Sequence, residues 1–228
     1  MNIADLTVET QPLYFQCLED WSDEMQESGD HKARWYEHMK DKGLGVKLAL
    51  DERGVVGGMI QYVPIEHAIA EGEGLYMILC IWVHGHRQGR GNFQKRGMGS
   101  ALLAAAEADA RRRGAKGMAA WGIMLPFWMK ASWFRKHGYV KADRSGMAVL
   151  LWKKFADDAQ APRWLRPVRE PEAEPGKVCV TAFVNGWCPG QNIVCERARR
   201  ACEELGERVE FRQIDTLDDA TRRQWGIA

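Results

Sequence analysis

The stretch Gln94-Lys95-Arg96-Gly97-Met98-Gly99-Ser100 decides the fold of the first part of the chain. An apolar run from Leu75 to Val83 precedes it, and an alanine-rich run from Ala101 to Arg113 with helical spacing follows it. The order is therefore a strand, a glycine turn and a helix. Such a turn aims backbone N–H groups at one point, where the helix dipole also favours an anion. Since a Cβ would hold an anion away from the backbone, the two glycines predict a phosphate or pyrophosphate site.

The spacing of the glycines excludes two common phosphate-binding motifs. A dinucleotide-binding turn needs a third glycine where this chain has Leu102, and a P-loop needs a Gly-Lys-Ser/Thr sequence that does not occur. The remaining pattern, Gln-x-x-Gly-x-Gly, resembles motif A of the GNAT acyltransferases. In that family these amides hold the pyrophosphate of acetyl-CoA. Taken alone, the pattern suits equally well a turn that only connects a strand to a helix.

A second segment, Phe127 to Tyr139, supports the resemblance. Its apolar residues recur at helical spacing and Gly138 ends the helix, as in GNAT motif B. A strand from Met118 to Trp121 precedes it, and a turn from Asp143 to Gly146 and a strand from Met147 to Trp152 follow. The resemblance covers about residues 1–155. It implies an α/β chain with the GNAT acyltransferase fold, a mixed central sheet flanked by helices.

The resemblance also implies acetyl-CoA as co-substrate and a set of residues that bind it. These are Ile81, Trp82 and Val83 of the strand and Gln94, Lys95, Arg96, Gly97, Met98, Gly99 and Ser100 of the turn. The family often uses a tyrosine on the motif B helix to protonate the leaving thiolate, but this position is Phe134. Water, Tyr139 or the arginine-rich loop described below would then replace it, or the thiolate leaves directly.

Candidate bases lie at the two ends of the apolar strand. Glu71 and Glu73 precede it, and His84 and His86 follow it. A carboxylate in an apolar cleft has a raised pKa that suits base catalysis. We therefore name Glu71, Glu73 and His84 as catalytic candidates. The alternatives are a solvated loop for the glutamates and a phosphate contact for His84. Cys80 lies inside the strand, where a thiol is usually buried and inert, so we expect direct transfer without an acetyl-cysteine.

Two other segments bear on the site. The loop from His84 to Phe93 is longer than usual in the family and rich in glycine and arginine. We expect it to be mobile and cationic, and either to close over the phosphates of CoA or to stay solvated. The helical stretches Leu13 to Met25 and His31 to Lys42 would cover the acceptor site. Trp35, Tyr36 and Met39 either line that site or pack the helices on the sheet.

Composition limits the class of protein. The 228 residues are 46% hydrophobic with a net charge of +1, so no global field favours nucleic acid or an anionic membrane. No apolar run is long enough to span a bilayer and the N-terminus lacks the features of a signal peptide, so we expect a cytoplasmic protein. The six cysteines contain no Cys-x-x-Cys pair, and we expect no metal site.

The composition changes after Phe155. Residues 156–176 contain four of the eight prolines and are predicted to form a linker. Residues 177–228 contain a strand, a loop, a helix and a strand, which resembles the active-site part of the thioredoxin fold. They resemble more closely the YoaP-like domain found after some bacterial GNAT domains. The matching segments are Asn185-Gly186-Trp187-Cys188-Pro189, Cys195-Glu196-Arg197-Ala198 and Trp225-Gly226-Ile227.

Cys188 is the chemical candidate of this second unit. Gln191 stands where a thioredoxin has its second cysteine, so Cys188 is expected to act as a monothiol. A helix N-terminus lowers a thiol pKa, which makes Cys188 a catalytic candidate, but a packing role fits equally well. A β-α-β unit of about fifty residues is marginal alone. Either the sequence is truncated here or the acetyltransferase domain supports the fragment.

These inferences predict an acetyl-CoA-dependent N-acetyltransferase that transfers the acetyl group directly to a small-molecule amine. They are also compatible with a homodimer. The alternative is a non-catalytic acyl-CoA-binding sensor with a thiol-reactive C-terminal domain. A weaker third reading is a thiol oxidoreductase fused to a degenerate acyltransferase.

Overall fold

The computed structural model describes residues 1–125, 129–173 and 175–226 of the chain. It divides into two compact units. The first consists of Met1–Trp21 and Lys40–Trp164, and the second of Ser22–Met39 and Leu165–Ala228. The second unit therefore includes an N-terminal segment that is distant in sequence from the rest of it. Each unit is described separately below.

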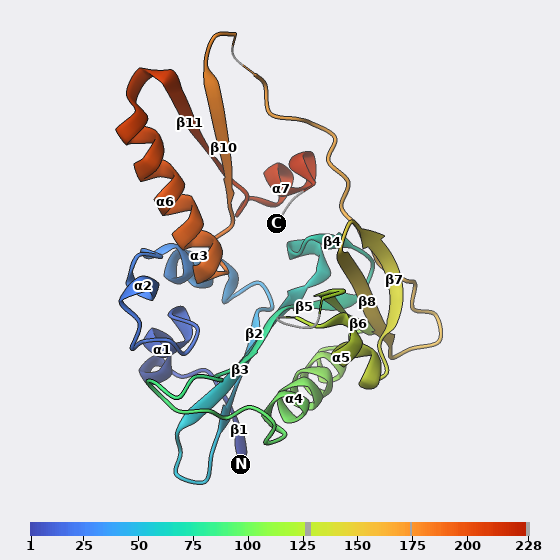
Figure 1. Cartoon of the computed structure of the whole chain (residues 1–228). Coiled ribbons are helices and arrows are strands. Elements are labelled where there is room, and N and C mark those ends of the chain that lie inside the picture. The colour runs from blue at the N-terminus through green and yellow to red at the C-terminus, as the bar shows by residue number, and fades with distance from the viewer. Residues whose placement is uncertain (126–128, 174, 227–228) are drawn as a thin grey trace. The chain divides into compact units, whose positions relative to one another are not determined.

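The first unit is built on a seven-stranded mixed sheet (Figure 1). Only β5 and β6 run parallel, and every other neighbouring pair in this sheet is antiparallel. This confirms the predicted mixed central sheet. The strands in spatial order are β1 (Asn2–Asp5), β2 (Gly45–Leu50), β3 (Val56–Pro64), β5 (Leu75–Val83), β6 (Gly117–Ile123), β8 (Ala148–Lys154) and β7 (Val140–Ser145).

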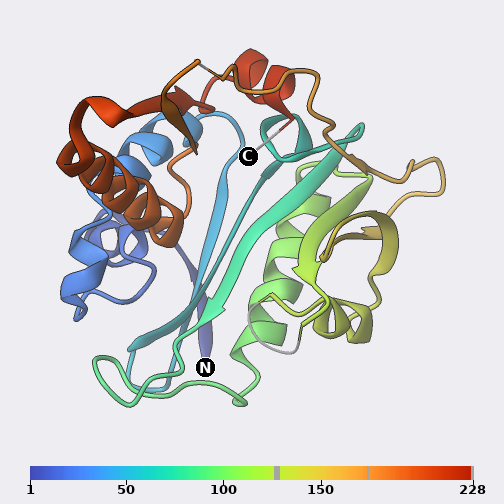
Figure 2. The ribbon, with the colours of Figure 1, turned by 45° about the horizontal axis from the view of Figure 1, so that its top comes forward.

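Helices cover this sheet. The long helix α4 (Met98–Arg112) lies along one face against β2, β3, β5 and β6 (Figure 2), and α5 (Ala131–Lys136) packs on β6 and β8. Burial of Leu102, Leu103 and Ala106 of α4 fits the apolar spacing of the sequence. The opposite face receives α1 (Gln11–Phe15), which follows the 3-10 turn η1 (Val8–Thr10).

A buried ionic network also holds α4 to the sheet. The Tyr62 hydroxyl donates to Oδ2 of Asp109 over 2.6 Å, and Nε of Arg113 lies 2.8 Å from the same oxygen. Lys47 Nζ is 3.8 Å from Oδ1 of Asp109. Burial alone would raise the pKa of Asp109, but the Tyr62 hydrogen bond and the charges of Arg113 and Lys47 hold it below its usual value. Burial and Asp109 together raise the pKa of Tyr62.

The structure corrects several predicted elements of the first part of the chain. The helix expected over Leu13 to Met25 is interrupted, because Cys17 and Leu18 adopt positive φ angles of 50° and 66°. The residues from Asp143 to Ser145 are not a turn but the end of β7, and the hairpin turns at Gly146 instead. The motif B helix is shorter than expected, since α5 spans only Ala131–Lys136. Phe127 and Trp128 of that motif lie outside the described residues.

Other elements were not predicted. Two short strands, β4 (Ala70–Glu71) and β9 (Arg163–Trp164), pair with each other across more than ninety residues of sequence. Residues 156–176 therefore begin with an ordered segment, in which the Trp164 side chain is buried. The 3-10 turn η2 (Ile65–His67) precedes β4.

The second unit contains a β-α-β arrangement in the predicted order. The strands β10 (Val178–Val184) and β11 (Val209–Asp215) are parallel, with α6 (Pro189–Leu205) and the 3-10 turn η3 (Gly206–Arg208) between them. A further helix, α7 (Asp219–Trp225), was not predicted. Ile227 of the proposed Trp-Gly-Ile match lies outside the described residues.

The N-terminal segment of this unit packs on α6. It forms α2 (Asp23–Gln26) and α3 (His31–Met39). Trp35 and Met39 are almost fully buried, and a Cβ on Gly186 would lie 3.2 Å from that of Trp35. Trp35 therefore packs on the loop before α6, a role that differs from the predicted packing on the sheet. No helix in the described ranges is both long and apolar enough to cross a membrane.

Candidate functional site

The two parallel strands of the first unit separate halfway along their length. The ladder between β5 and β6 covers only four pairs, from Leu75–Gly117 to Ile78–Ala120. Beyond this point β5 continues along β3 and β6 continues along β8. At the point of separation, Nε1 of Trp121 donates to the Leu79 carbonyl over 2.8 Å. The sheet therefore opens toward the carboxyl ends of both strands.

A β-bulge accounts for the change in direction of β5. Tyr62 of β3 pairs with Ile78, but the next residue, Gln61, pairs with Cys80. Leu79 is thus the extra residue. An extra residue bends the bulged strand and increases its twist. The bulge therefore directs the last residues of β5 away from β6.

A cavity of about 450 Å³ lies at the open end of these strands. Its walls come from the end of β5, the glycine turn, the first residues of α4, and the segment leading into and through α5. The lining residues are Ile81, Trp82, Val83, Phe93, Gln94, Lys95, Gly97, Met98, Gly99, Ser100, Met129, Lys130, Trp133 and Phe134.

The glycine turn suits an anion. Lys95 and Gly97 have positive φ angles of 61° and 83°, and Gly97 is the N-cap of α4. Left-handed residues within a turn bring backbone N–H groups together in a concave surface that binds anions. The free N–H groups at the start of a fifteen-residue helix add a partial positive charge. The side chains of Lys95 and Lys130 in the same wall add full charges.

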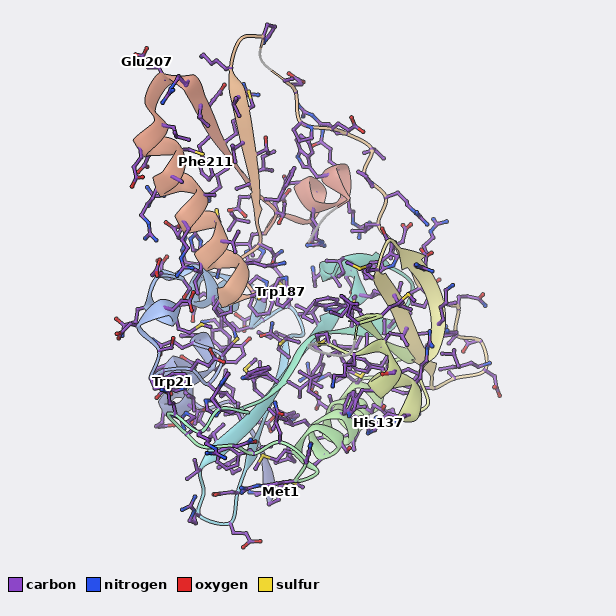
Figure 3. The ribbon with its side chains drawn as sticks, viewed as in Figure 1. Met1, Trp21, His137, Trp187, Glu207 and Phe211 are labelled. Carbon is purple, nitrogen blue, oxygen red and sulfur yellow. The ribbon has the colours of Figure 1, made fainter. Side chains whose placement is uncertain are left out.

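Ser100 and His137 form a pair beside this turn. The Ser100 hydroxyl lies 2.9 Å from Nε2 of His137, whose Nδ1 lies 2.9 Å from the Trp133 carbonyl. Since the carbonyl can only accept, Nδ1 carries the proton and Nε2 accepts from Ser100. The Trp133 and His137 rings are 4.1 Å apart, and Figure 3 shows His137 near the end of α5. The pair therefore links α5 to the first turn of α4.

The structure brings together nine of the ten residues expected to bind the cofactor. The exception is Arg96, whose guanidinium lies over the Phe93 ring at 5.6 Å from its centre. The sequence did not indicate that Phe93, Met129, Lys130, Trp133 and Phe134 complete the wall. The aromatic run of motif B was a signal for the last two. The indole N–H of Trp82 is buried and has no hydrogen-bond partner among the described residues.

Glu71 and Glu73 lie at the other end of β5. Oε1 of Glu71 accepts a hydrogen bond of 2.5 Å from Nε of Arg163, and Glu73 is exposed near Lys116. Eight residues of extended chain separate Glu73 from Ile81, which is about 25 Å. The structure therefore does not bring these two carboxylates to the cavity.

His84 is fully buried and both of its ring nitrogens are engaged. Trp21 Nε1 donates to Nε2 over 2.9 Å, and Nδ1 lies 2.7 Å from the Gly91 carbonyl. The imidazole is thus a neutral tautomer with its proton on Nδ1. It does not line the cavity, and its contacts give it a structural role in place of the expected catalytic one.

The loop from His84 to Phe93 is attached to the N-terminal segment. Nε and Nη2 of Arg90 donate to the two carboxylate oxygens of Asp20 over 3.1 and 3.0 Å. Trp21, labelled in Figure 3, covers Gly89, where a Cβ would lie 2.0 Å from the indole ring. The Phe93 N–H donates to the His84 carbonyl and closes the loop at its base. These contacts attach the loop to Asp20 and Trp21.

The residues considered for protonating the thiolate have clear positions. Phe134 lines the cavity, so the tyrosine of the family is indeed absent there. Tyr139 is buried against Phe134, with ring centres 5.5 Å apart, and is not part of the wall. Burial and Glu107 raise its pKa. Tyr139 is therefore unsuited to donate a proton in the cavity.

Cys188 is the N-cap of α6 in the second unit and is partly exposed. Asn192 holds the preceding loop, because its side-chain amide donates to the Gly186 carbonyl over 3.0 Å. No disulfide joins the six cysteines, all of which lie in the described part of the chain. Cys195 is buried, and this burial raises its pKa.

Comparisons with known proteins agree with this architecture. A family model described as the acetyltransferase (GNAT) family matches residues 5–139. Among solved structures, a ribosomal-protein-alanine N-acetyltransferase from Brucella melitensis is 18% identical over 68% of this chain and 100% of its own, with a TM-score of 0.50. A GNAT-family protein from Desulfovibrio desulfuricans is 18% identical over 67% and 98%, also with a TM-score of 0.50. A search of curated proteins found no significant match.

Proposed function

The chain belongs to the acetyltransferase (GNAT) family, and from this premise we propose that it transfers the acetyl group of acetyl-CoA to an amine. The observation that carries the proposal is the cavity formed by the end of β5, the N-terminus of α4 and the segment that leads into α5, at the open end of the separated strands. Its cationic, amide-lined end suits a pyrophosphate, and its apolar walls suit a pantetheine chain. The acceptor is proposed to be a small-molecule amine.

In this proposal the pyrophosphate binds the N–H groups of Gly97, Met98, Gly99 and Ser100. Lys95 and Lys130 balance its charge. The residues Ile81 to Val83 have left the β6 ladder, so their backbone groups on that side can pair with the pantetheine amides. Gln94 supports the turn, since its side chain packs on Gly85. Transfer is direct, because Cys80 is buried within β5.

A backbone N–H of β5 near the bulge would stabilise the oxyanion as the amine attacks the thioester carbon. The C–N bond forms, the C–S bond breaks and the CoA thiolate leaves. With Phe134 in the place of the usual tyrosine, the thiolate takes its proton from the attacking amine or from water.

Gly97→Ala tests the cofactor site. Gly97 has a φ of 83° and open space where a Cβ would be added, so alanine is strained by about 1–2 kcal/mol and projects toward the bound anion. Gly114→Ala is a matched control, because Gly114 has a φ of 81° and equally open space at the other end of α4. We expect calorimetry to show a loss of CoA affinity of about 100-fold for Gly97→Ala only. Equal affinities of the two variants would contradict the assignment.

The alternative function, a non-catalytic sensor of acyl-CoA, has the same cofactor site. Release of CoA thiol from acetyl-CoA in the presence of primary amines separates the two. Turnover supports the enzyme, and tight CoA binding without turnover of any amine supports the sensor. The position of Cys188 at a helix N-terminus suits a thiol-reactive role in either case.

A further inference from the structure

We propose that His86, positioned by Glu19, is the base that takes a proton from the acceptor amine; this inference rests on the proposed acetyl transfer. The sequence placed His86 after the same strand as His84, but only the structure distinguishes them. His84 is buried with both nitrogens engaged. The His86 side chain is 52% exposed and therefore accessible to a substrate.

Glu19 gives His86 the partner that a base needs. Oε1 of Glu19 lies 3.7 Å from Nε2 of His86, and the Glu19 side chain is only 16% exposed. At this distance the carboxylate is an ion-pair partner for the imidazolium that forms when Nδ1 accepts a proton. As in other acid–base sites, a carboxylate lies next to the histidine that would accept the proton.

The ring of His86 lies beside the cavity. Its centre is 6.3 Å from the ring of Trp82, which lines the cavity wall, and 5.8 Å from the ring of Trp21. His86 thus approaches the end of β5 from the side of the N-terminal segment, while α4 and the glycine turn occupy the other side. His86 does not itself line the cavity, but an amine placed against the Trp82 ring would be close to the His86 ring that packs beside it.

The attached loop holds this pair in place. The bidentate Arg90–Asp20 contact and the Trp21–His84 hydrogen bond join the loop, on both sides of His86, to the two residues that follow Glu19. Without these contacts Glu19 and His86, which are distant in sequence, would not remain together. In this proposal the long loop holds His86 beside Glu19. This role differs from both roles expected from the sequence, closure over the CoA phosphates and a solvated loop.

The ammonium form of the acceptor gives one proton to Nδ1 of neutral His86, and the nitrogen lone pair attacks the thioester carbon. The C–N bond forms and the C–S bond breaks. The leaving thiolate receives the second amine proton, and His86 releases its proton to water. The products are the acetamide, CoA thiol and one proton.

Kinetics of the full-length His86→Gln variant test the proposal. CoA thiol release is followed from pH 6 to 10 with n-butylamine, spermidine and a peptide with an N-terminal alanine as acceptors. We expect kcat/KM at pH 7 to fall about 10²- to 10⁴-fold, the usual contribution of a general base. The loss should shrink toward pH 10, because more of the amine is already deprotonated. His67→Gln, in η2 of the same unit, is the control and should behave as the parent.

Glu19→Gln tests the positioning role. The groups facing His86 are Glu19, the His84 ring at 5.4 Å and the neighbouring Asp20–Arg90 pair, with Arg87 on the same loop. Loss of the Glu19 carboxylate should reduce kcat/KM about 10-fold with CoA affinity unchanged, and Glu19→Asp, which keeps a carboxylate, should restore part of the rate. A merely structural role of Glu19 would not distinguish these two variants.

CoA affinity, measured by calorimetry, separates this inference from the proposed function. Parent-like CoA binding by His86→Gln with the expected loss of rate supports the inference. A rate within threefold of the parent at pH 7, or a loss that is the same at every pH, overturns it. Failure of the parent itself to bind CoA would overturn the cofactor site and this inference with it.

Discussion

The chain contains two parallel β-α-β units that differ in how far their strands stay paired. In the first, β5 and β6 flank α4 and pair over four residues, from Leu75 to Ile78. In the second, β10 and β11 flank α6 and pair over all seven, from Val178 to Val184. The strands separate in the first unit only, and the cavity lies where they do. In the first of these units the same local order of elements is combined with a bulge that redirects one strand, and the cofactor-sized cavity lies there.

The two helices are also held by different forces. Asp109 anchors α4 through a buried network with Tyr62, Arg113 and Lys47. On α6, Glu196 lies 2.8 Å from the buried His31 of the N-terminal segment, but Arg197 and Arg200 form more exposed ion pairs with Glu27, which lower the pKa of Glu27 to about 2. Buried pairs are costly to break, whereas exposed pairs contribute little. The first helix is thus fixed firmly beneath the proposed cofactor site.

The largest expected effect on stability is that of Asp109→Asn. Removal of the charge leaves Lys47 and Arg113 without their buried partner, which typically costs about 3–5 kcal/mol. Because the folded pKa of Asp109 lies below 3.8, its contribution is complete above about pH 4 and is lost as the pH falls through the folded pKa. In urea unfolding, the difference in unfolding free energy between parent and variant should therefore become smaller as the pH falls below about 4.

Asp157→Asn serves as the control for this prediction. Asp157 pairs with Lys154 at 3.5 Å but is fully exposed, so its loss should leave the unfolding curve unchanged. The role of the buried network would be contradicted if Asp109→Asn lowered the unfolding free energy by less than about 1 kcal/mol. It would also be contradicted if the difference from the parent did not depend on pH.

Gly122→Ala tests the second wall of the cavity. A Cβ on Gly122 in β6 would lie 2.8 Å from the nitrogen of Ala131 and from the carbonyl of Met129. Since backbone atoms must move to admit it, we expect a loss of about 1–3 kcal/mol of unfolding free energy. CoA affinity should also fall, because Met129 lines the cavity.

Gly190→Ala in the second unit provides the comparison. The nearest atom to its added Cβ would be the Cys188 sulfur at 3.9 Å, so neither stability nor CoA affinity should suffer. CoA affinity of Gly122→Ala equal to that of the parent would remove this segment from the cofactor site.

The smallest expected effect is on Cys188. Its position at the start of α6 favours the thiolate, so alkylation should reach half its maximal rate at a lower pH than for Cys179, a partly exposed cysteine within β10. Single-cysteine variants followed by mass spectrometry measure both rates. Cys188→Ser should change global stability little. Identical pH midpoints, with turnover unaffected by Cys188→Ser, would leave Cys188 only a packing role.

Several elements could be predicted because their signals are local. The apolar run from Leu75 to Val83 matches β5, and the alanine-rich run lies within α4. Prediction failed where distant residues decide the backbone. The pairing of Ala70 with Trp164 has no local signal in either segment. The same limit applies to the site, since the sequence favours His84 as a base and no local signal indicates its contact with Trp21, 63 residues away.

Local patterns are enough to predict the strand–turn–helix of the proposed phosphate site, because glycine positions and side-chain periodicity act within a few residues. The order of elements in the second unit follows from local patterns too. The bulge at Leu79, the separation of β5 and β6, and the packing of Ser22–Met39 with the C-terminal residues appear only in the folded chain. The same is true of the contact between Glu19 and His86. Such contacts depend on the free energy of packing segments that are distant in sequence. Patterns within a few residues do not predict them.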